Sequence, residues 1–293
     1  MYGFLKTIEA GLGVLSLLAY GLILGVLFRR PKEFSNAYYG IVKYGGIVDI
    51  VFYIWDWFSN RLVGVPFFMP FYRLFFQYFP WLGGFFWLNQ ACFHAAQAQT
   101  MLAGWQRVCL MSKPIFADVG FRTIVNYFFA LLPVGVIVVS SPIAIWHQAV
   151  EVAATEIRFD VSQSTGVIHY NVIVGSVCVL VNLFILLTSV VYLIKYRNAL
   201  NAIRRLFFIS FFIGVTRFAV LVLGNLSVMN DYLGWKWGPW LSEIALPLTM
   251  DLTLLSAPWL HLTFNRAIQR RLSVIFRIKE ENQVQIALPI VEK

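Results

Sequence analysis

Residues 80–104, PWLGGFFWLNQACFHAAQAQTMLAG, form an apolar run that also carries Gln90, His94 and Gln97 at spacings of four and three. These spacings place the three polar side chains on one face of a helix. A polar side chain that faces lipid is penalised, whereas one that faces protein or trapped water is tolerated. We therefore predict that this segment is the middle helix of a membrane bundle, with its polar face turned inward.

The composition extends this prediction to the whole chain. Of the 293 residues, 59% are hydrophobic and 17% aromatic. Only 13% are charged, whereas soluble proteins have about 25%. The net charge of +9 comes from basic residues dispersed among loops, not gathered on one face as a nucleic-acid site requires. The composition predicts an all-α integral membrane protein with no nucleic-acid partner.

The number of membrane spans follows from the apolar runs. About 20 apolar residues are needed to cross the roughly 30 Å hydrocarbon layer. Seven segments meet this requirement, at residues 8–28, 38–58, 80–104, 123–146, 170–194, 206–228 and 240–264. The sequence therefore predicts a seven-transmembrane helix bundle over residues 1–264, with the two ends of the chain on opposite sides of the bilayer.

The orientation follows from the cationic residues between the spans. Sixteen Lys and Arg residues fall in one set of connections and the tail, and five fall in the other set. Cytoplasmic loops carry the excess of Lys and Arg. We predict an external N-terminus and a cytoplasmic C-terminus. Tryptophans such as Trp55, Trp146 and Trp240 fall at the predicted outer ends, where their rings favour the headgroup level.

Two segments outside the spans are also predicted to contact the membrane surface. Residues 65–80 are rich in Phe but are broken by Pro66, Pro70 and Pro80, which predicts an outer loop lying on the interface. Residues 265–293 are predicted to form a short cytoplasmic amphipathic helix and a loose tail. The apolar face of this helix would consist of Ile268, Leu272, Ile275 and Phe276. Arginines around that face would contact the anionic inner leaflet.

Five ionisable side chains lie within the predicted spans: Lys43, Asp49, Arg217, Glu243 and Asp251. Each would cost about 2.5–3.5 kcal/mol at the bilayer centre, so an inward-facing partner or a watery cavity is expected. Our first hypothesis is an ion pair between Arg217 and Asp251, and Asp49 is the competing partner of Arg217. Such a pair could bind ligand or only hold helices together. Lys43 is predicted to snorkel to the inner face, and Glu243 lies near the outer mouth.

Enzyme classes find little support in this chain. The four histidines are separated, and none forms a His-x-x-x-His or Glu-x-x-His pair that would put two metal ligands on one helix face. A Gly-x-Ser-x-Gly elbow and a phosphate-cradling glycine loop are also absent from the sequence. The last span lacks the central lysine of a retinal-binding pump. We expect no enzyme activity, no metal and no cofactor.

The segment that closes the long run, WQRVCLMSKP at residues 105–114, contains Arg107, Lys113 and Pro114. An arginine at the inner end of a central helix can pair with neighbouring helices at rest and turn toward a cytoplasmic partner when the bundle opens. It can equally be an ordinary cytoplasmic anchor. The spacing alone leaves both interpretations open.

Several short motifs, spread over nearly the whole chain, are similar to those of one receptor family. They are Arg29-Arg30-Pro31 after the first span, Gln106-Arg107 to Pro114 after the third, Asp251-Leu252 and Ala257-Pro258-Trp259-Leu260 in the seventh, and Asn265-Arg266 after it. On these motifs the chain resembles the nematode serpentine chemoreceptors, most closely class gamma, within the seven-helix receptors coupled to G proteins. Trp105-Gln106 replaces the acidic residue that precedes the arginine in rhodopsin-like receptors, so an acid–arginine lock is not available within this motif.

The resemblance implies a chemosensory receptor in the plasma membrane, with the sensory cilium as an implied location. It would bind a small molecule and engage a heterotrimeric G protein. The predicted outer segments are too short for a binding domain, so the ligand must enter the bundle. The predicted ligand-binding residues are Gln90, His94, Gln97, Arg217, Glu243 and Asp251. The predicted G-protein-coupling residues are Gln106, Arg107, Lys113, Pro114, Arg204 and Arg205.

Other functional classes remain as alternatives. A seven-span ion channel or transporter would use Asp49, Arg217 and Asp251 as a charged pathway, and ionic current or uptake without active G proteins would favour it. A seven-span hydrolase would contain bound metal. Insect-type odorant channels also have seven spans but the opposite orientation, so the side on which the N-terminus lies separates them from this receptor class.

Overall fold

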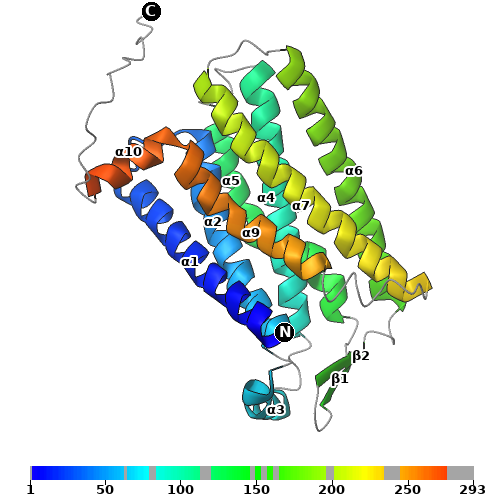
Figure 1. Ribbon diagram of the computed structural model, residues 1–293. Coiled ribbons are helices and arrows are strands. Elements are labelled where there is room, and N and C mark those ends of the chain that lie inside the picture. Colours follow the sequence, from blue (N-terminus) through cyan, green and yellow to red (C-terminus); the bar gives the residue numbers. More distant parts are fainter. Residues whose placement is uncertain are drawn as a thin grey trace, which may run out of the picture.

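The computed structural model describes residues 2–62, 65–78, 84–112, 120–145, 149–152, 157–160, 165–195, 201–233 and 245–275. Seven long helices in these ranges run along one another as a bundle (Figure 1). They are α1 (Tyr2–Arg29), α2 (Ala37–Asp56), α4 (Gly84–Ser112), α5 (Phe121–Ile145), α6 (Thr165–Lys195), α7 (Asn201–Leu233) and α9 (Leu246–Phe264). Each of them overlaps one of the seven apolar segments expected from the sequence.

Shorter elements lie at the two ends of the bundle. At the end where α1 begins are the π-helical turn η1 (Trp57–Arg61), the 3-10 turn η2 (Pro66–Phe68), α3 (Met69–Tyr78) and the hairpin of β1 (Ala149–Val152) and β2 (Ile157–Asp160). The two strands are antiparallel, with Ala149 opposite Asp160 and Val152 opposite Ile157. We call this the α3 end. The opposite end carries α10 (Arg266–Ile275), and we call it the α10 end.

Three helices in the described part of the chain are long and apolar enough to cross a membrane. The qualifying segments are Ala10–Arg29, Phe121–Ser141 and Val172–Tyr192. α5 and α6 also expose large apolar side chains, with Leu131 63% exposed and Phe184 68% exposed. Outward-facing leucine and phenylalanine suit a lipid environment, because a soluble protein rarely leaves so much apolar surface in contact with water. The protein is therefore a helical membrane protein.

α4, which was predicted to be the middle helix, lies at the centre of the bundle. α4 packs against α2, α5, α6 and α7, and two of its three predicted polar residues, His94 and Gln97, are buried at 8% and 3% exposure. The side chain of Gln90 lies outside the described part of the structure. α4 extends two turns beyond the predicted end at Gly104, because the segment up to Ser112 contains good helix-forming residues and precedes Pro114. The prediction of a middle helix with an inward polar face is confirmed for His94 and Gln97.

Glycines allow α4 to approach its neighbours closely. A Cβ added to Gly45 of α2 would lie 1.9 Å from Nε2 of Gln99 on α4. A Cβ added to Gly104 would lie 2.3 Å from Cγ2 of Ile185 on α6. Membrane helices use small residues in this way, since close packing replaces the hydrophobic driving force that lipid removes.

The contact at Gly104 yields a direct test. Gly104→Ala is expected to lower the stability of the protein by about 1–3 kcal/mol, because the added methyl group overlaps Ile185 and the helices must separate. Gly135→Ala on α5 is the matched control, since its added Cβ would meet no heavy atom within 4 Å. It is expected to be neutral or to stabilise by up to about 1 kcal/mol. Thermal unfolding of the purified variants measures both, and an equal loss in the two variants would contradict the packing.

Residues 65–78, the described part of the predicted outer loop at 65–80, are largely helical. The structure contains η2 and the helix α3, with Pro70 in the first turn of the helix, where a missing N–H removes no helical bond. Tyr72 of α3 is fully buried, and its hydroxyl donates to the carbonyl oxygen of Phe58 at 2.5 Å. Burial raises the pKa of this phenol to about 12. Pro66 and Pro70 therefore lie at the starts of helical turns instead of interrupting them.

α10 occupies the position of the predicted amphipathic helix, but its apolar face is divided. Ile268 is fully buried and packs with Ile23, Val26 and Tyr39 in a cluster formed by α1 and α2, with Leu272 beside it. Ile275 is 47% exposed, and Phe276 lies outside the described residues. Ile268 was expected to face the inner leaflet and instead contacts protein, because α10 folds back over the ends of α1 and α2.

One asparagine fixes the start of α10. Oδ1 of Asn265 accepts hydrogen bonds from the backbone N–H of Ile268 at 3.3 Å and from the hydroxyl of Tyr39 at 3.2 Å. The first bond is a helix N-cap and the second ties α10 to α2.

Asn265→Ala is therefore expected to cost about 1–2 kcal/mol and to speed amide hydrogen exchange along α10. Tyr39→Phe is the matched variant, because it removes only the bond between helices. It is expected to cost about 1 kcal/mol and to leave the exchange of α10 slow. Hydrogen–deuterium exchange with mass spectrometry distinguishes the two, and unchanged exchange in Asn265→Ala would show that the cap does not hold α10.

Candidate functional site

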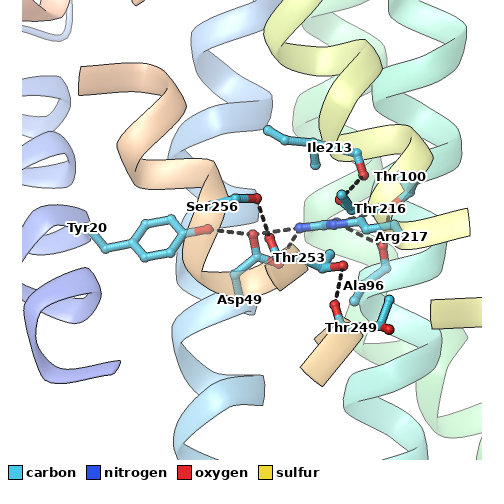
Figure 2. Close-up of polar contacts among 10 residues, drawn as sticks. All are labelled: Tyr20, Asp49, Ala96, Thr100, Ile213, Thr216, Arg217, Thr249, Thr253 and Ser256. Carbon is cyan, nitrogen blue, oxygen red and sulfur yellow. Dashed lines mark hydrogen bonds and ion pairs between the residues drawn. The ribbon is translucent and has the colours of Figure 1, made fainter. Parts of the chain in front are cut away.

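A buried ion pair joins four helices at the middle of the bundle (Figure 2). Nη2 of Arg217 on α7 donates to both carboxylate oxygens of Asp49 on α2, at 2.6 Å for Oδ2. The hydroxyl of Tyr20 on α1 donates to Oδ2 of Asp49 at 2.9 Å. Nη1 of Arg217 donates to the carbonyl oxygen of Ala96 and to Oγ1 of Thr100 on α4, both at 3.0 Å. Each charged group thus has several polar partners at a site that is shielded from bulk solvent.

The first pairing hypothesis is wrong and the competing one is confirmed. Arg217 pairs with Asp49 and not with Asp251, although α7 and α9 are in contact. Asp251 lies within the first two turns of α9 as described, close to the α3 end, and it binds a different arginine there. Depth along the helix decides the pairing, because a guanidinium reaches only the carboxylates at its own level.

The partner of Asp251 is Arg61, which lies beyond the end of the predicted second span, 38–58. Nη2 and Nη1 of Arg61 donate to the two oxygens of Asp251 at 2.6 and 3.0 Å, and Nε donates to Asp56 at 2.7 Å. The guanidinium also lies 5.2 Å from the ring centroid of Trp57. Arg61 ends the π-helical turn η1, which continues α2 and directs its side chain back over the bundle. The sequence signal was the Asp56–Arg61 spacing of five, which matches a π-helical rather than an α-helical turn.

Arg107 is turned into the bundle instead of toward water. Its side chain is 3% exposed, and its guanidinium passes between Gly104 of its own helix and Gly214 of α7. Gln106 is also buried at 4% exposure, whereas Trp105 is 55% exposed. An arginine that acted only as a cytoplasmic anchor would extend into water. The burial therefore agrees with the resting arrangement in which Arg107 contacts neighbouring helices.

A cavity of about 60 Å³ lies between the Asp49–Arg217 pair and Arg107. Its lining residues come from α1, α2, α4, α7 and α9, and they include Tyr38 and His261. The Tyr38 hydroxyl lies 3.5 Å from Nδ1 of His261. Among the predicted ligand-binding residues whose side chains the structure describes, Arg217 is the one that lines this cavity. The cavity holds a few water molecules at most and is too small for a typical organic ligand.

The remaining predicted residues fall into three groups. His94 and Gln97 are buried on α4, toward the α3 end from Thr100, and Oε1 of Gln97 has no hydrogen-bond partner in the described structure. Arg204 and Arg205 lie in the first turns of α7, and their side chains are not described. Glu243, Lys113 and Pro114 lie outside the described residues.

Lys43 lies over aromatic rings near the α10 end. Its ammonium nitrogen is 4.2 Å from the ring centroid of Tyr44 and 5.3 Å from that of Phe28. Cation–π contact lowers the cost of holding a charge near the bilayer. As for metal sites, the described ranges contain no group of three or more His, Cys, Asp or Glu residues that could hold an ion.

The helical bundle and its apolar outer helices define a helical integral membrane protein. The chain matches the family model described as Srg family chemoreceptor over residues 7–272. It therefore belongs to this family, the nematode serpentine receptor class gamma, and the resemblance inferred from the sequence motifs is confirmed. A search of curated proteins finds no match to the chain.

Proposed function

We propose that the protein is a seven-transmembrane chemosensory receptor that binds a small molecule within its bundle and activates a heterotrimeric G protein. The observation that carries this proposal is the buried network of Tyr20, Asp49, Arg217 and Thr100. The network links α1, α2, α4 and α7, so a shift of one helix changes hydrogen bonds on the other three. A receptor needs such coupling between its two ends, and family membership gives the chemosensory role.

The proposed topology places the α3 end outside the cell and the α10 end in the cytoplasm, in the plasma membrane of a sensory cell and its cilium. The excess of Lys and Arg in the connections at the α10 end supports this orientation. In this proposal each of the seven long helices is a membrane span, near the residues expected from the sequence.

The ligand is proposed to bind in the outer half of the bundle. The predicted ligand-binding residues come from the third, sixth and seventh predicted spans and are Gln90, His94, Gln97, Arg217, Glu243 and Asp251. The inward burial of His94 and Gln97 supports this location. Aromatic side chains such as Phe52 and Phe93 lie at the same level and would supply apolar contact.

The cytoplasmic ends are proposed to bind the G protein through Gln106, Arg107, Lys113, Pro114, Arg204 and Arg205. In this proposal a ligand shifts the equilibrium because it binds one arrangement of the bundle more tightly than the other. Arg107 would leave its contact with Gly214 as the helices separate. The internal pairing of Asp49 and Arg217 gives less support to a charged ion pathway, since each charge is neutralised within the bundle.

The experiment uses the full chain in cells that carry a G-protein dissociation sensor, with a panel of small molecules as probes. We expect ligand-dependent dissociation that Arg107→Gln abolishes while surface expression persists. Arg73→Gln is the control, because Arg73 is exposed on α3 at the opposite end and should leave signalling unchanged. Ligand-evoked ionic current that persists with the G proteins inactivated would overturn the proposal in favour of a channel.

A further inference from the structure

The second half of α10 carries a sequence pattern that the proposed function leaves unused. Arg270 and Arg271 stand three and two residues before Ser273, and the apolar Val274 follows it. Basophilic serine kinases select hydroxyls in this context, because acidic side chains in their substrate cleft pair with the two arginines and an apolar pocket accepts the next residue. A pattern this short also occurs by chance, so the exposure and the position of the serine decide whether it can act.

The serine and its neighbours lie on the surface of the protein. Ser273 is partly exposed, Arg270 is exposed, and the side chains of Arg271 and Val274 are 40% and 64% exposed. Helical geometry places Ser273 about 140° around the axis of α10 from the buried Ile268, which packs against α1 and α2. The residues that a kinase would contact therefore face away from the bundle.

The contacts of α10 hold its first half more firmly than its second half. Ile268 is fully buried, Oδ1 of Asn265 caps the first turn, and Nε2 of Gln269 donates to two carbonyl oxygens of α9 at 2.7 and 2.8 Å. In the second half Leu272 is only partly buried, and Oγ of Ser273 donates within the helix itself, to the carbonyl oxygen three residues earlier at 2.8 Å. The end of so short a helix frays at low cost. The last turn can thus open into a kinase cleft while the first turn stays attached.

We propose that Ser273 is a phosphorylation site for a basophilic serine kinase. The kinase transfers the γ-phosphoryl group of ATP to Oγ. The bond from Oγ to phosphorus forms as the bond from phosphorus to the β–γ bridging oxygen breaks, ADP leaves, and the hydroxyl proton passes to the catalytic carboxylate of the kinase. ATP and such kinases are cytoplasmic, so the site rests on the proposed orientation, in which the α10 end lies inside the cell.

A phosphate on Ser273 changes how α10 is held. Nε of Arg271 donates to Oε1 of Glu33, in the connection between α1 and α2, at 2.7 Å, and both side chains are more than a third exposed. A phosphate carries about −1.5 to −2 charge and competes with this single carboxylate for Arg271. Negative charge in the last turn of a helix also opposes the helix dipole. Phosphorylation thus loosens the second half of α10 and lowers the positive charge that it presents to the anionic inner leaflet.

The experiment uses the purified full-length protein in detergent micelles. The probe is the catalytic subunit of cyclic-AMP-dependent protein kinase with ATP and Mg²⁺, and mass spectrometry of proteolytic fragments locates the phosphate. We expect phosphate on Ser273, and we expect Ser273→Ala to abolish it. Arg270→Gln is expected to slow the reaction at Ser273 at least about tenfold, because it removes a charge-assisted contact to the kinase.

Ser112 is the matched control within the chain. It is exposed in the last turn of α4, and its hydroxyl also donates to a carbonyl oxygen one turn earlier, at 2.8 Å. The residues three and two positions before it are Cys109 and Leu110, so it lacks the two arginines and should gain no phosphate. Equal phosphorylation of both serines would overturn the proposal, because exposure alone would then select the target. An unmodified Ser273, under conditions in which the kinase modifies a standard peptide substrate, would overturn it as well.

Hydrogen–deuterium exchange of the phosphorylated protein tests the consequence. Amides in the second half of α10 are expected to exchange about 2–5-fold faster than in the unmodified protein, while those near Ile268 stay slow. Unchanged exchange would overturn the proposed loosening of α10. Both readouts use purified protein without ligand or G protein. The phosphorylation site and the signalling function therefore succeed or fail separately.

Intact cells that express the full chain test whether the site is used. A membrane-permeant cyclic AMP analogue should raise the phosphate on Ser273. Its absence in cells, where the purified protein is modified, would overturn Ser273 as a cytoplasmic target.

Discussion

Arg217→Ala is expected to abolish surface expression of the receptor. The substitution leaves Asp49 at 3% exposure without its cation, and removing one partner of a buried ion pair costs about 3–5 kcal/mol. Since folded domains are stable by only about 5–15 kcal/mol, the variant should be largely retained and degraded. Flow cytometry of an extracellular epitope on intact cells, compared with total protein, measures this loss.

Paired substitutions show whether loss of the ion pair itself causes the loss of surface expression. Asp49→Leu combined with Arg217→Met removes both charges, and it should restore much of the expression lost in Arg217→Ala. Exchange of the residues at 217 and 251 is expected to give no rescue, because Asp251 lies at a different depth and binds Arg61. Wild-type expression of Arg217→Ala would contradict the structure, since a lone buried carboxylate would then carry no cost.

Arg61→Gln is expected to have the second largest effect, lowering stability by about 2–3 kcal/mol. It leaves two carboxylates, Asp56 and Asp251, with side chains 4% and 11% exposed and without the guanidinium that bridges them. Their mutual repulsion should loosen the contact between η1 and α9 at the α3 end. Thermal unfolding of the purified protein at neutral pH measures the loss.

A double-mutant cycle assigns that loss to the bridge. Asp251→Asn in the Arg61→Gln background should cost less than Asp251→Asn alone, because the two residues interact. Glu33→Gln is the matched control. Its bond to Arg271 is 2.7 Å long, but the side chains are 37% and 40% exposed, so its loss should change stability by less than about 1 kcal/mol. Additive effects of the Arg61 and Asp251 substitutions would contradict the bridge.

The sequence was informative where a single helix determined the outcome. The spacing of His94 and Gln97 predicted which face of α4 is buried, because helical periodicity is a local property. Burial of polar residues within a span likewise predicted that Arg217 has a carboxylate partner. The family was readable from short motifs such as Gln106-Arg107 and Asn265-Arg266, and the family match supports that reading.

The sequence was less informative where two helices must be placed relative to each other. The choice between Asp49 and Asp251 depends on the depth at which α2, α7 and α9 cross, and no local pattern encodes it. The pairing of Arg61 was missed because the second span was predicted to end at residue 58. In the structure η1 extends α2 as far as Arg61, and the side chain reaches Asp251. The inward direction of Arg107 required Gly214 on another helix, and the sequence does not show that these residues are neighbours.

The amino-terminal helix α1 also stabilises the bundle, because the hydroxyl of Tyr20 binds Asp49 on α2. Ser16, one turn earlier, accepts from the indole of Trp259 at 2.9 Å, so the same stretch also supports the last helix of the bundle. A shortened protein that lacks α1 would lose both hydrogen bonds, the one to Asp49 and the one to Trp259. Such a product should fail quality control in the cell, and fluorescent reporters for this receptor are therefore better attached at its carboxyl terminus.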